Sequence, residues 1–386
     1  MVRPLEKNYK WSQYMSIVIS GTGLFTPPHS ISNDELVTAF NQYVENYNAE
    51  NEEAINNEQL TALKPSSSEF IEKASGIKSR YVMYKDGALD PKTMMPLIPQ
   101  RSDEQLSAQA EMAVGAARQA MAAANKTADD IDLIIVACSY TQRAYPAIAI
   151  EVQQALGCKG WAYDMLVACS SATFGIMNAS NALCGDTAKT VLVINPELNF
   201  PQINLRDRDS HFIFGDVATA IVIEKQATAT ADHCFKILTK KPITTFSNNI
   251  RSNFGHTNKC DPETMLDNDK MFVQQGRKVF KEVLPMVSQL ITEQMEAANV
   301  EAKDLKRLFL HQANINMNNF VAKKVLGRDP IGNEAPIILD KFANTASAGS
   351  IIAFHLNHDD MIAGDKALIC SFGAGYSAGC LVIEHI

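Results

Sequence analysis

Residues 127–136 read TADDIDLIIV and residues 301–310 read EAKDLKRLFL, so a polar segment that suits a helix end leads twice into an apolar strand. The strand that begins at Thr190 has a similar counterpart in residues 364–369, GDKALI. The matching segments lie about 170 residues apart, which indicates an internal repeat. Because strands alternate with helices, the sequence predicts a duplicated α/β protein whose two similar units pack face to face.

The repeat predicts an N-terminal half over residues 1–228 and a C-terminal half over residues 229–386. In the first half we expect an Ala-rich helix over 102–125, a strand over 131–138, a helix over 148–156 and strands over 190–194 and 218–224. Two stretches interrupt this pattern. Residues 41–68 are interpreted as a helical or loop insertion, and the proline-containing residues 84–101 as either a flap over a pocket or a passive surface loop.

The composition excludes several classes of protein. Of the 386 residues 46% are hydrophobic and 20% charged, which allows a large buried core. The net charge of -8 argues against a nucleic-acid partner, which requires clustered Lys and Arg. No apolar stretch reaches the roughly 18 residues needed to span a bilayer. The scattered cysteines fit the reducing cytoplasm better than a disulfide framework or a zinc site.

A candidate nucleophile lies where a strand gives way to a helix. Residues 164–173 read DMLVACSSAT, in which an apolar strand runs into small residues that can start a tightly packed helix. Cys169 is therefore expected at a helix N-terminus, where free backbone N–H groups and the helix dipole favour the nucleophilic thiolate. A cysteine taken at random is more often inert core, so the prediction depends on this position.

Two further polar residues follow apolar segments in the C-terminal half. His311 ends the strand LFL at 308–310, so its ring is expected at the carboxyl edge of a sheet, where open α/β folds bind ligands. Asn344 precedes the small-residue run TASAGS and taken alone could be a helix cap. The turn FGAGY at 372–376 lets the backbone approach a ligand and present amides to an oxyanion. Taken alone, His311 could equally be a core histidine and FGAGY an ordinary turn.

Together these segments resemble the condensing enzymes of the thiolase superfamily, and most closely β-ketoacyl-acyl carrier protein synthase III and its long-form relatives. The resemblance runs from Ile17 to Ile383. It implies the thiolase fold, a duplicated αβαβα architecture of five layers. The most specific matches are VACS at 167–170, FGD at 214–216, HQAN at 311–314 and NTAS at 344–347.

The resemblance implies a ping-pong reaction in which Cys169 takes an acyl group from acyl-coenzyme A or acyl carrier protein. A malonyl thioester then enters, and His311 and Asn344 donate hydrogen bonds to the enolate that forms as carbon dioxide leaves. The carbanion attacks the acyl-cysteine to give a β-ketoacyl thioester for fatty-acid or polyketide-like lipid synthesis. The N–H groups of Cys169 and Ala374 would form the oxyanion hole. No metal or redox cofactor is implied.

The same resemblance implies substrate-binding positions, with departures from the family pattern. Phe70 stands where short members place a tryptophan against the coenzyme A adenine, Ala74 replaces the other half of that clamp, and Arg208 aligns with a further arginine at the adenine. Asn316 replaces an arginine that helps to dock the carrier protein. The remaining basic docking positions are kept, at Lys281, Lys323 and Lys324, although ordinary surface lysines are an equally good interpretation.

Tyr145 aligns with an aromatic residue that the family inserts from the partner subunit into the acyl pocket, which implies a homodimer. Together with the insertion at 41–68 and the segment 84–101, it suggests a primer other than acetyl, such as a medium-chain or β-ketoacyl group.

Other classes of protein use similar residues. A papain-like protease has Cys, His and Asn in this order, but its CGSCW signature is absent. A degradative thiolase needs a second cysteine in the C-terminal glycine turn, whereas Cys370 is displaced from that place and suits a strand core. A non-catalytic partner subunit commonly lacks the nucleophile that Cys169 supplies. A non-decarboxylating acyltransferase with the same Cys-His-Asn site stays open.

Overall fold

The computed structural model describes residues 16–252, 263 and 270–386. Residues 1–15 of the expected N-terminal half, and residues 253–262 and 264–269 of the expected C-terminal half, lie outside the described residues. Within the described part, none of the helices combines the length and apolar character that a membrane crossing requires.

One mixed sheet of nine strands, in the order β11-β12-β13-β8-β1-β7-β6-β4-β5, runs through both halves. The two halves meet where β1 pairs with β8, through Val18 with Lys236 and Ile19 with Phe235. The first half supplies β1 (Ile17–Phe25), β4 (Leu133–Cys138), β5 (Trp161–Leu166), β6 (Thr190–Glu197) and β7 (Val217–Lys225). The second half supplies β8 (Phe235–Ser247), β11 (Leu305–Leu310), β12 (Lys366–Gly373) and β13 (Gly375–His385).

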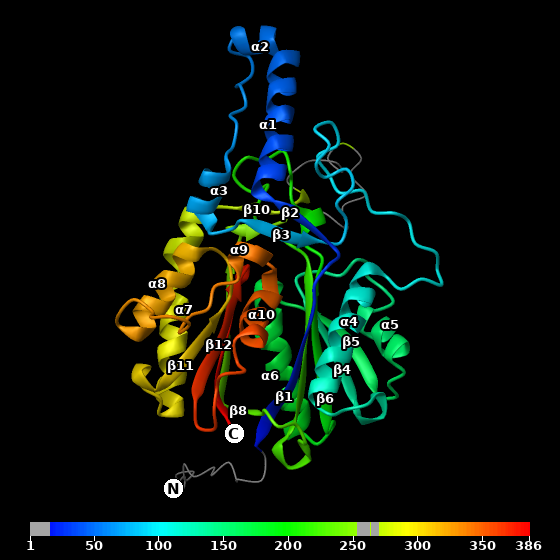
Figure 1. Ribbon diagram of the computed structural model, residues 1–386, viewed down its shortest axis with the longest axis vertical. Helices are drawn as coiled ribbons and strands as arrows, with labels where there is room; N and C mark the ends of the chain where they lie inside the picture. The colour runs from blue at the N-terminus through cyan, green and yellow to red at the C-terminus, as the bar shows by residue number, and fades with distance from the viewer. Residues whose placement is uncertain (1–15, 253–262, 264–269) are drawn as a thin grey trace, which may run out of the picture.

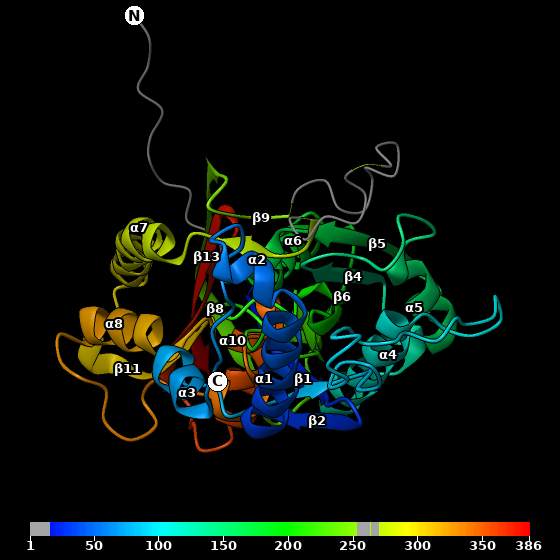
Figure 2. The same ribbon diagram turned by 90° about the horizontal axis from the view of Figure 1, so that it is seen from above.

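Helices cover this sheet in the layers expected of a thiolase fold (Figure 2). The outer helices α4 (Ala108–Ala123) and α5 (Ile148–Leu156) pack on the strands of the first half. The inner helices α6 (Ser171–Cys184) and α10 (Gly349–Leu356) contact strands of both halves. The outer helix α7 (Gly276–Ala298) packs on the strands of the second half and α8 (Ile315–Leu326) packs beside it. The strands of each half thus form one β layer on either side of α6 and α10, so the order of layers is α/β/α/β/α.

The layers explain why the central strands are apolar throughout. Leu133, Ile135 and Ala137 of β4 enter the cluster between the two halves, whereas Ile134 and Val136 enter the cluster under α4. Successive side chains of a strand point to opposite faces, so a strand covered on both faces has no polar side.

The two repeated segments also have the same local structure. Residues Ala128–Asp130 and Ala302–Asp304 each form a 3₁₀ turn with a capping box just before β4 and β11. The repeat seen in the sequence is thus present in the backbone.

The insertion at 41–68 projects from the body of the molecule (Figure 1). It consists of the outer part of α1 (Asn33–Glu50), the short α2 (Glu52–Asn56) and a return segment that leads to α3 (Ser68–Ser75). Helix α1 begins with a capping box between Ser32 and Glu35. Short elements complete the upper end: β2 (His29–Ser32), β3 (Ser79–Val82), β9 (Ile250–Arg251), β10 (Val273–Gln274) and α9 (Leu339–Phe342).

Candidate active site

Cys169 lies in a 3₁₀ turn, Ala168–Ser170, between β5 and α6. Ala168 has a φ of 46°, a left-handed conformation that is uncommon outside glycine and that is often found at functional sites. The Ser171 hydroxyl closes the turn: it accepts from the Val167 N–H at 2.8 Å and lies 2.8 Å from the carbonyl oxygen of Ala168. Cys169 is thus held just before a helix, as the sequence predicts.

The thiol of Cys169 is partly accessible but lies deep in the protein. Burial raises its pKa to about 12, and the charge of Glu197 acts in the same direction. Backbone hydrogen bonds from Ala374 and from Cys169 itself oppose this shift in pKa. Desolvation thus acts against the thiolate that the helix N-terminus was expected to favour and outweighs the backbone donors.

Gly373, the last residue of β12, leaves the space that Cys169 occupies. A β-carbon on this glycine would lie 2.6 Å from the β-carbon of Cys169 and 3.0 Å from its sulfur. Only a residue without a side chain fits at this close approach.

His311 follows the last residue of β11, where its backbone N–H donates to the Cys370 carbonyl at 2.8 Å. The ring meets Phe372 edge-on at 5.2 Å between centroids. Burial lowers the pKa of His311 to about 4, and a backbone hydrogen bond with Ala346 opposes the shift. The lowered pKa favours the neutral ring, which carries a single N–H.

Asn344 is fixed by its neighbours on both main chain and side chain. Its backbone N–H donates to the Ile213 carbonyl at 3.0 Å, and its carbonyl accepts from Gly215 at 3.2 Å. The side-chain oxygen accepts from the N–H of Ala346 at 2.9 Å. Because the amide oxygen is held in this way, the NH₂ group lies on the other side of the amide and is available as a donor.

Cys169, His311 and Asn344 line one cavity of about 220 Å³. The structure therefore brings the three residues together, although they lie far apart in the sequence. The rest of the lining is largely apolar and includes Ile77, Phe212, Phe214, Phe272 and Met317. Such a largely apolar cavity, with a few polar groups in its lining, suits an acyl chain and a thioester arm.

The residues expected at the adenine contact each other. The Arg208 guanidinium carbon lies 4.1 Å from the centre of the Phe70 ring, and its Nε donates to the Pro65 carbonyl at 2.8 Å. Asn316 is exposed in the first turn of α8, and its amide nitrogen lies 3.5 Å from the Ala74 carbonyl oxygen. Ala74 itself lines the cavity.

The candidate carrier-docking lysines are exposed on two neighbouring helices, with Lys281 on α7 and Lys323 and Lys324 on α8. Lys323 pairs with Asp329 at 3.1 Å. Phe280 and Phe320 lie between these helices with ring centroids 5.9 Å apart. The two helices thus present basic and aromatic side chains on one face.

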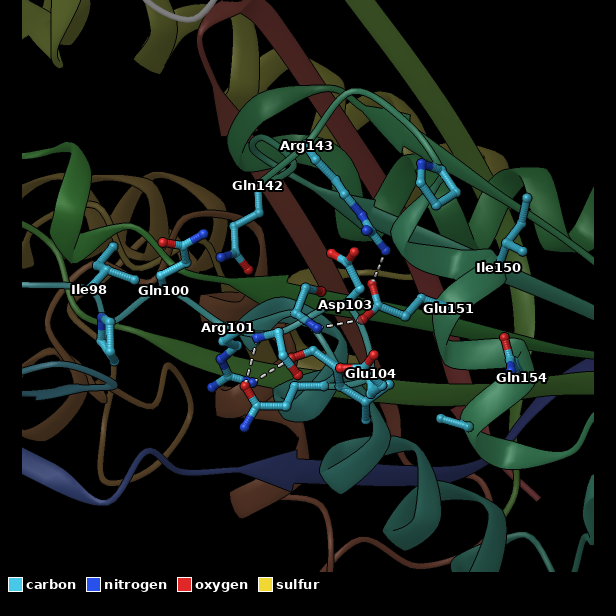
Figure 3. Close-up of a pocket in the computed structure, with 17 residues that line it drawn as sticks. Ile98, Gln100, Arg101, Asp103, Glu104, Gln142, Arg143, Ile150, Glu151 and Gln154 are labelled. Atoms are coloured by element: carbon cyan, nitrogen blue, oxygen red, sulfur yellow. Dashed lines mark hydrogen bonds and ion pairs between the residues drawn. The ribbon is translucent and has the colours of Figure 1, made fainter.

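Tyr145 is 84% exposed and does not line the Cys169 cavity. The neighbouring residues Arg143 and Pro146 border a second cavity, of about 940 Å³ (Figure 3). Residues 98–101, from the segment interpreted as a possible flap, border this second cavity and not the one at Cys169. Arg143 and Glu151, which both border this second cavity, form an ion pair with 2.6 Å between the guanidinium nitrogen and the carboxylate oxygen (Figure 3).

Comparison with known proteins agrees with this geometry. Residues 163–239 match the family model of 3-oxoacyl-acyl-carrier-protein synthase III, and residues 295–385 match the model of its C-terminal part. The β-ketodecanoyl-acyl-carrier-protein synthase of Pseudomonas aeruginosa is 53% identical over 346 residues, which cover 90% of this chain and 99% of that protein. The chain belongs to the β-ketoacyl-acyl carrier protein synthase III family.

A more distant relative supports the family assignment, and a solved structure shows the same fold. The enzyme of Agrobacterium fabrum is 30% identical over 85% of this chain and 94% of its own length. The crystal structure of the Aquifex aeolicus synthase III superposes with a TM-score of 0.73 at 24% identity and covers 95% of this chain and 99% of that one. The predictions of a thiolase fold and of an acyl-transferring condensing enzyme are confirmed, and the protease interpretation is excluded.

Two residues of this synthase site were not singled out in the sequence. Gly373 lies within the FGAGY turn, but its contact with Cys169 appears only in three dimensions. Glu197 is a fully buried carboxylate at the end of β6 whose charge acts on Cys169. The sequence did carry one signal for Glu197, since it is a charged residue at the end of the long, largely apolar strand β6.

Proposed function

We propose that this synthase condenses a medium-chain acyl group, held on Cys169, with a malonyl thioester. The observation that carries the proposal is the convergence of the Cys169 thiol, the His311 ring and the Asn344 amide on one largely apolar cavity, with the Ala374 N–H directed at the Cys169 sulfur. These groups are the nucleophile and donors that the reaction needs.

In the first half-reaction the Cys169 sulfur attacks the carbonyl carbon of the primer thioester. A new C–S bond forms, the bond to the first carrier's sulfur breaks, and that carrier leaves with the proton of the Cys169 thiol. The N–H groups of Cys169 and Ala374 stabilise the negative oxygen of the tetrahedral intermediate. Removing one such donor typically lowers the rate by about 10²-fold or more.

In the second half-reaction the malonyl thioester loses carbon dioxide, and the electron pair of the broken C–C bond forms an enolate. The neutral His311 ring and the Asn344 NH₂ group donate to the enolate oxygen. The enolate carbon attacks the acyl carbon, the bond to Cys169 breaks, and the Cys169 thiolate takes a proton from solvent water. Each step uses only groups of this chain, its thioester substrates and solvent water, so we propose that no metal or redox cofactor takes part.

The name of the Pseudomonas aeruginosa relative describes a ten-carbon β-ketoacyl product. A malonyl thioester contributes two of those carbons, so we propose an eight-carbon acyl primer for this chain. We further propose acyl carrier protein as the carrier of the malonyl group, docking at Lys281, Lys323 and Lys324. The opposite charges of these lysines and an acidic carrier would steer the encounter.

We also propose that the enzyme works as a cytoplasmic homodimer. Tyr145, which the family resemblance places in the acyl pocket of the partner subunit, is highly exposed in the single chain and so is free to make that contact. All seven cysteines among the described residues are free thiols, which supports a reducing compartment.

Intact-protein mass spectrometry tests the proposed function. The wild type is incubated with octanoyl-coenzyme A and octanoyl-acyl carrier protein, then chased with malonyl-acyl carrier protein. We expect an octanoyl adduct that the malonyl donor discharges as a β-ketodecanoyl product, and no adduct on Cys169→Ala.

Cys184→Ala is a matched control, because this partly accessible cysteine ends the helix that Cys169 precedes. It should form the adduct like the wild type. An adduct that the malonyl donor leaves untouched would instead support the non-decarboxylating acyltransferase. The absence of any adduct on the wild type would refute Cys169 as the acyl acceptor.

A further inference from the structure

Glu197 carries a fully buried carboxylate with no ion-pair partner among the described residues. Hydrogen-bond donors surround it instead. Ser139 donates from its N–H at 3.1 Å and its hydroxyl at 2.5 Å, and Asn199 donates from its amide at 3.2 Å. Ser347 donates from its N–H at 3.2 Å and also from its hydroxyl. Burial raises the pKa of the Glu197 carboxyl, and the hydrogen bonds from Ser139, Ser347 and Asn199 oppose this shift, so the ionised form depends on these donors.

Ser347 connects this carboxylate to the reacting groups. It lies in the 3₁₀ turn Ala346–Ala348, between Asn344 and α10. Within the same turn, the N–H of Ala346 donates to the Asn344 side-chain oxygen at 2.9 Å, and the backbone of Ala346 is close enough to the His311 ring to raise its pKa. The turn therefore holds Asn344 directly and lies against His311.

The duplication shows that this turn is the counterpart of the Cys169 turn. Ala168 and Ala346 have φ values of 46° and 45°, and each begins a 3₁₀ turn that leads into an inner helix. Ser347 thus occupies in the second half the position that Cys169 occupies in the first. Its hydroxyl faces a buried carboxylate, however, and not the cavity.

The strand ends show the same relation. Leu133 pairs with Val191 in the first half, and Arg307 pairs with Ala367 at the same place in the second. Glu197 is as far along β6 from Val191 as Gly373 is along β12 from Ala367, so the two residues occupy corresponding positions. Each strand end therefore contacts the turn of the other half: Gly373 leaves room for Cys169, and Glu197 binds Ser347.

We propose that Glu197 is a positioning residue for the condensation step, whose carboxylate fixes the Ser347 turn and thereby holds Asn344 and His311 toward Cys169. This inference rests on the proposed function of those three residues. Glu197 itself does not line the cavity, so it acts through the turn and not by contact with substrate.

The test separates the two half-reactions in Glu197→Gln and Ser347→Ala. Acylation by octanoyl-coenzyme A and discharge by malonyl-acyl carrier protein are each followed in a single turnover by intact mass. We expect discharge to slow by about 10²-fold in Glu197→Gln, since small displacements of oriented groups have effects of that size. Acylation, which does not use the enolate donors, should change far less.

A pH profile gives a readout that a purely structural role would not change. Removing the negative charge near the Cys169 sulfur should shift its alkylation by iodoacetamide to lower pH in Glu197→Gln. The matched control is Glu224→Gln, which removes a second fully buried carboxylate, paired with Lys126 at 2.8 Å and remote from the cavity. It should lower the thermal midpoint but leave the alkylation profile and the ratio of the two half-reactions unchanged.

Wild-type discharge rates in both Glu197→Gln and Ser347→Ala would overturn the inference. So would equal losses of acylation and discharge that follow the loss of thermal midpoint, as in Glu224→Gln. If Glu197→Gln does not fold, Ser347→Ala decides alone, because it keeps the carboxylate and its other donors. A wild-type enzyme that acylates but is not discharged would refute the proposed function instead.

Discussion

At the scale of single residues, the sequence predicted where the reacting side chains lie but not their ionisation. Cys169 and His311 each follow an apolar strand of the sheet, whereas Asn344 follows the short helix α9, so its place beside them was expected only from the family resemblance. The raised pKa of Cys169 was not foreseeable, because it depends on burial and on the charge of Glu197, and neither can be read from the residues next to Cys169 in the sequence. Glu197 meets Ser347 across 150 positions of sequence, and no spacing rule reports such a contact.

Replacing Gly373 by Ala should block acylation. The new methyl group would lie 3.0 Å from the Cys169 sulfur, where the acyl carbon has to bind, so we expect the acylation rate to fall by about two orders of magnitude. Single-turnover mass spectrometry with octanoyl-coenzyme A measures this. Gly276→Ala is the control, since nothing lies within 4 Å of its added carbon. Wild-type acylation in Gly373→Ala would contradict the close approach.

At the scale of elements, prediction succeeded where the pattern was regular and failed at irregular ends. The helix predicted over 148–156 agrees with α5, whereas the one predicted over 102–125 begins only at Ala108, because Ser107 caps it. The insertion at 41–68 offered no clear period, since most of α1 beyond Val44 packs against little of the body. Its stability comes from side-chain to backbone bonds that periodicity does not show.

Asn41 and Asn48, two helical turns apart on α1, hold the returning chain. Asn48 both donates to the Leu63 carbonyl and accepts from the Leu63 N–H, at 3.0 and 2.9 Å, and Asn41 pairs with Ser66 in the same way. The two side-chain amides thus make the paired hydrogen bonds to the Leu63 and Ser66 backbones that a neighbouring β-strand would otherwise make. The projecting insertion is therefore a built element and not a loose loop.

Asn48→Ala should loosen the return segment without unfolding the protein. The two lost hydrogen bonds are worth about 1 kcal/mol each, and they act on a part that contacts little else. Hydrogen exchange should show faster exchange of the Leu63 amide at an almost unchanged global midpoint in urea. Asn46→Ala, which loses one exposed bond to Gln42, is the control. Unchanged protection at Leu63 would contradict this account.

At the scale of the whole molecule, a cluster of histidines marks the junction of the two halves, far apart in sequence but adjacent where β1 pairs with β8. His355 bonds Thr22 of β1 at 2.8 Å, and His233 bonds His385 of β13 at 3.1 Å. The ring of His358 packs on Phe354 and on Phe235 of β8, at 4.9 and 5.4 Å between centroids. Burial lowers the pKa values of His355, His358 and His385 and so favours the neutral form of these three rings.

The stability of the junction should therefore depend on pH. Burial lowers the pKa values of His355, His358 and His385, so the unfolded chain binds more protons than the native protein as the pH falls below about 6.5. The part of the unfolding free energy that depends on these histidines is thus fully present above that pH and is lost progressively below it. Asp359 and Asp365 raise these pKa values and reduce the effect without reversing it.

His358→Phe isolates this contribution, because phenylalanine keeps the aromatic packing but has no proton to bind. We expect the urea midpoint of the wild type to fall more between pH 7.5 and 5.5 than that of His358→Phe. Opposing groups such as Asp216, whose pKa burial raises to about 7, act equally in both proteins and cancel in the comparison. The exposed His29, replaced by Gln, should leave the wild-type pH dependence intact. Parallel pH profiles for the wild type and His358→Phe would show that protonation of His358 does not weaken the junction.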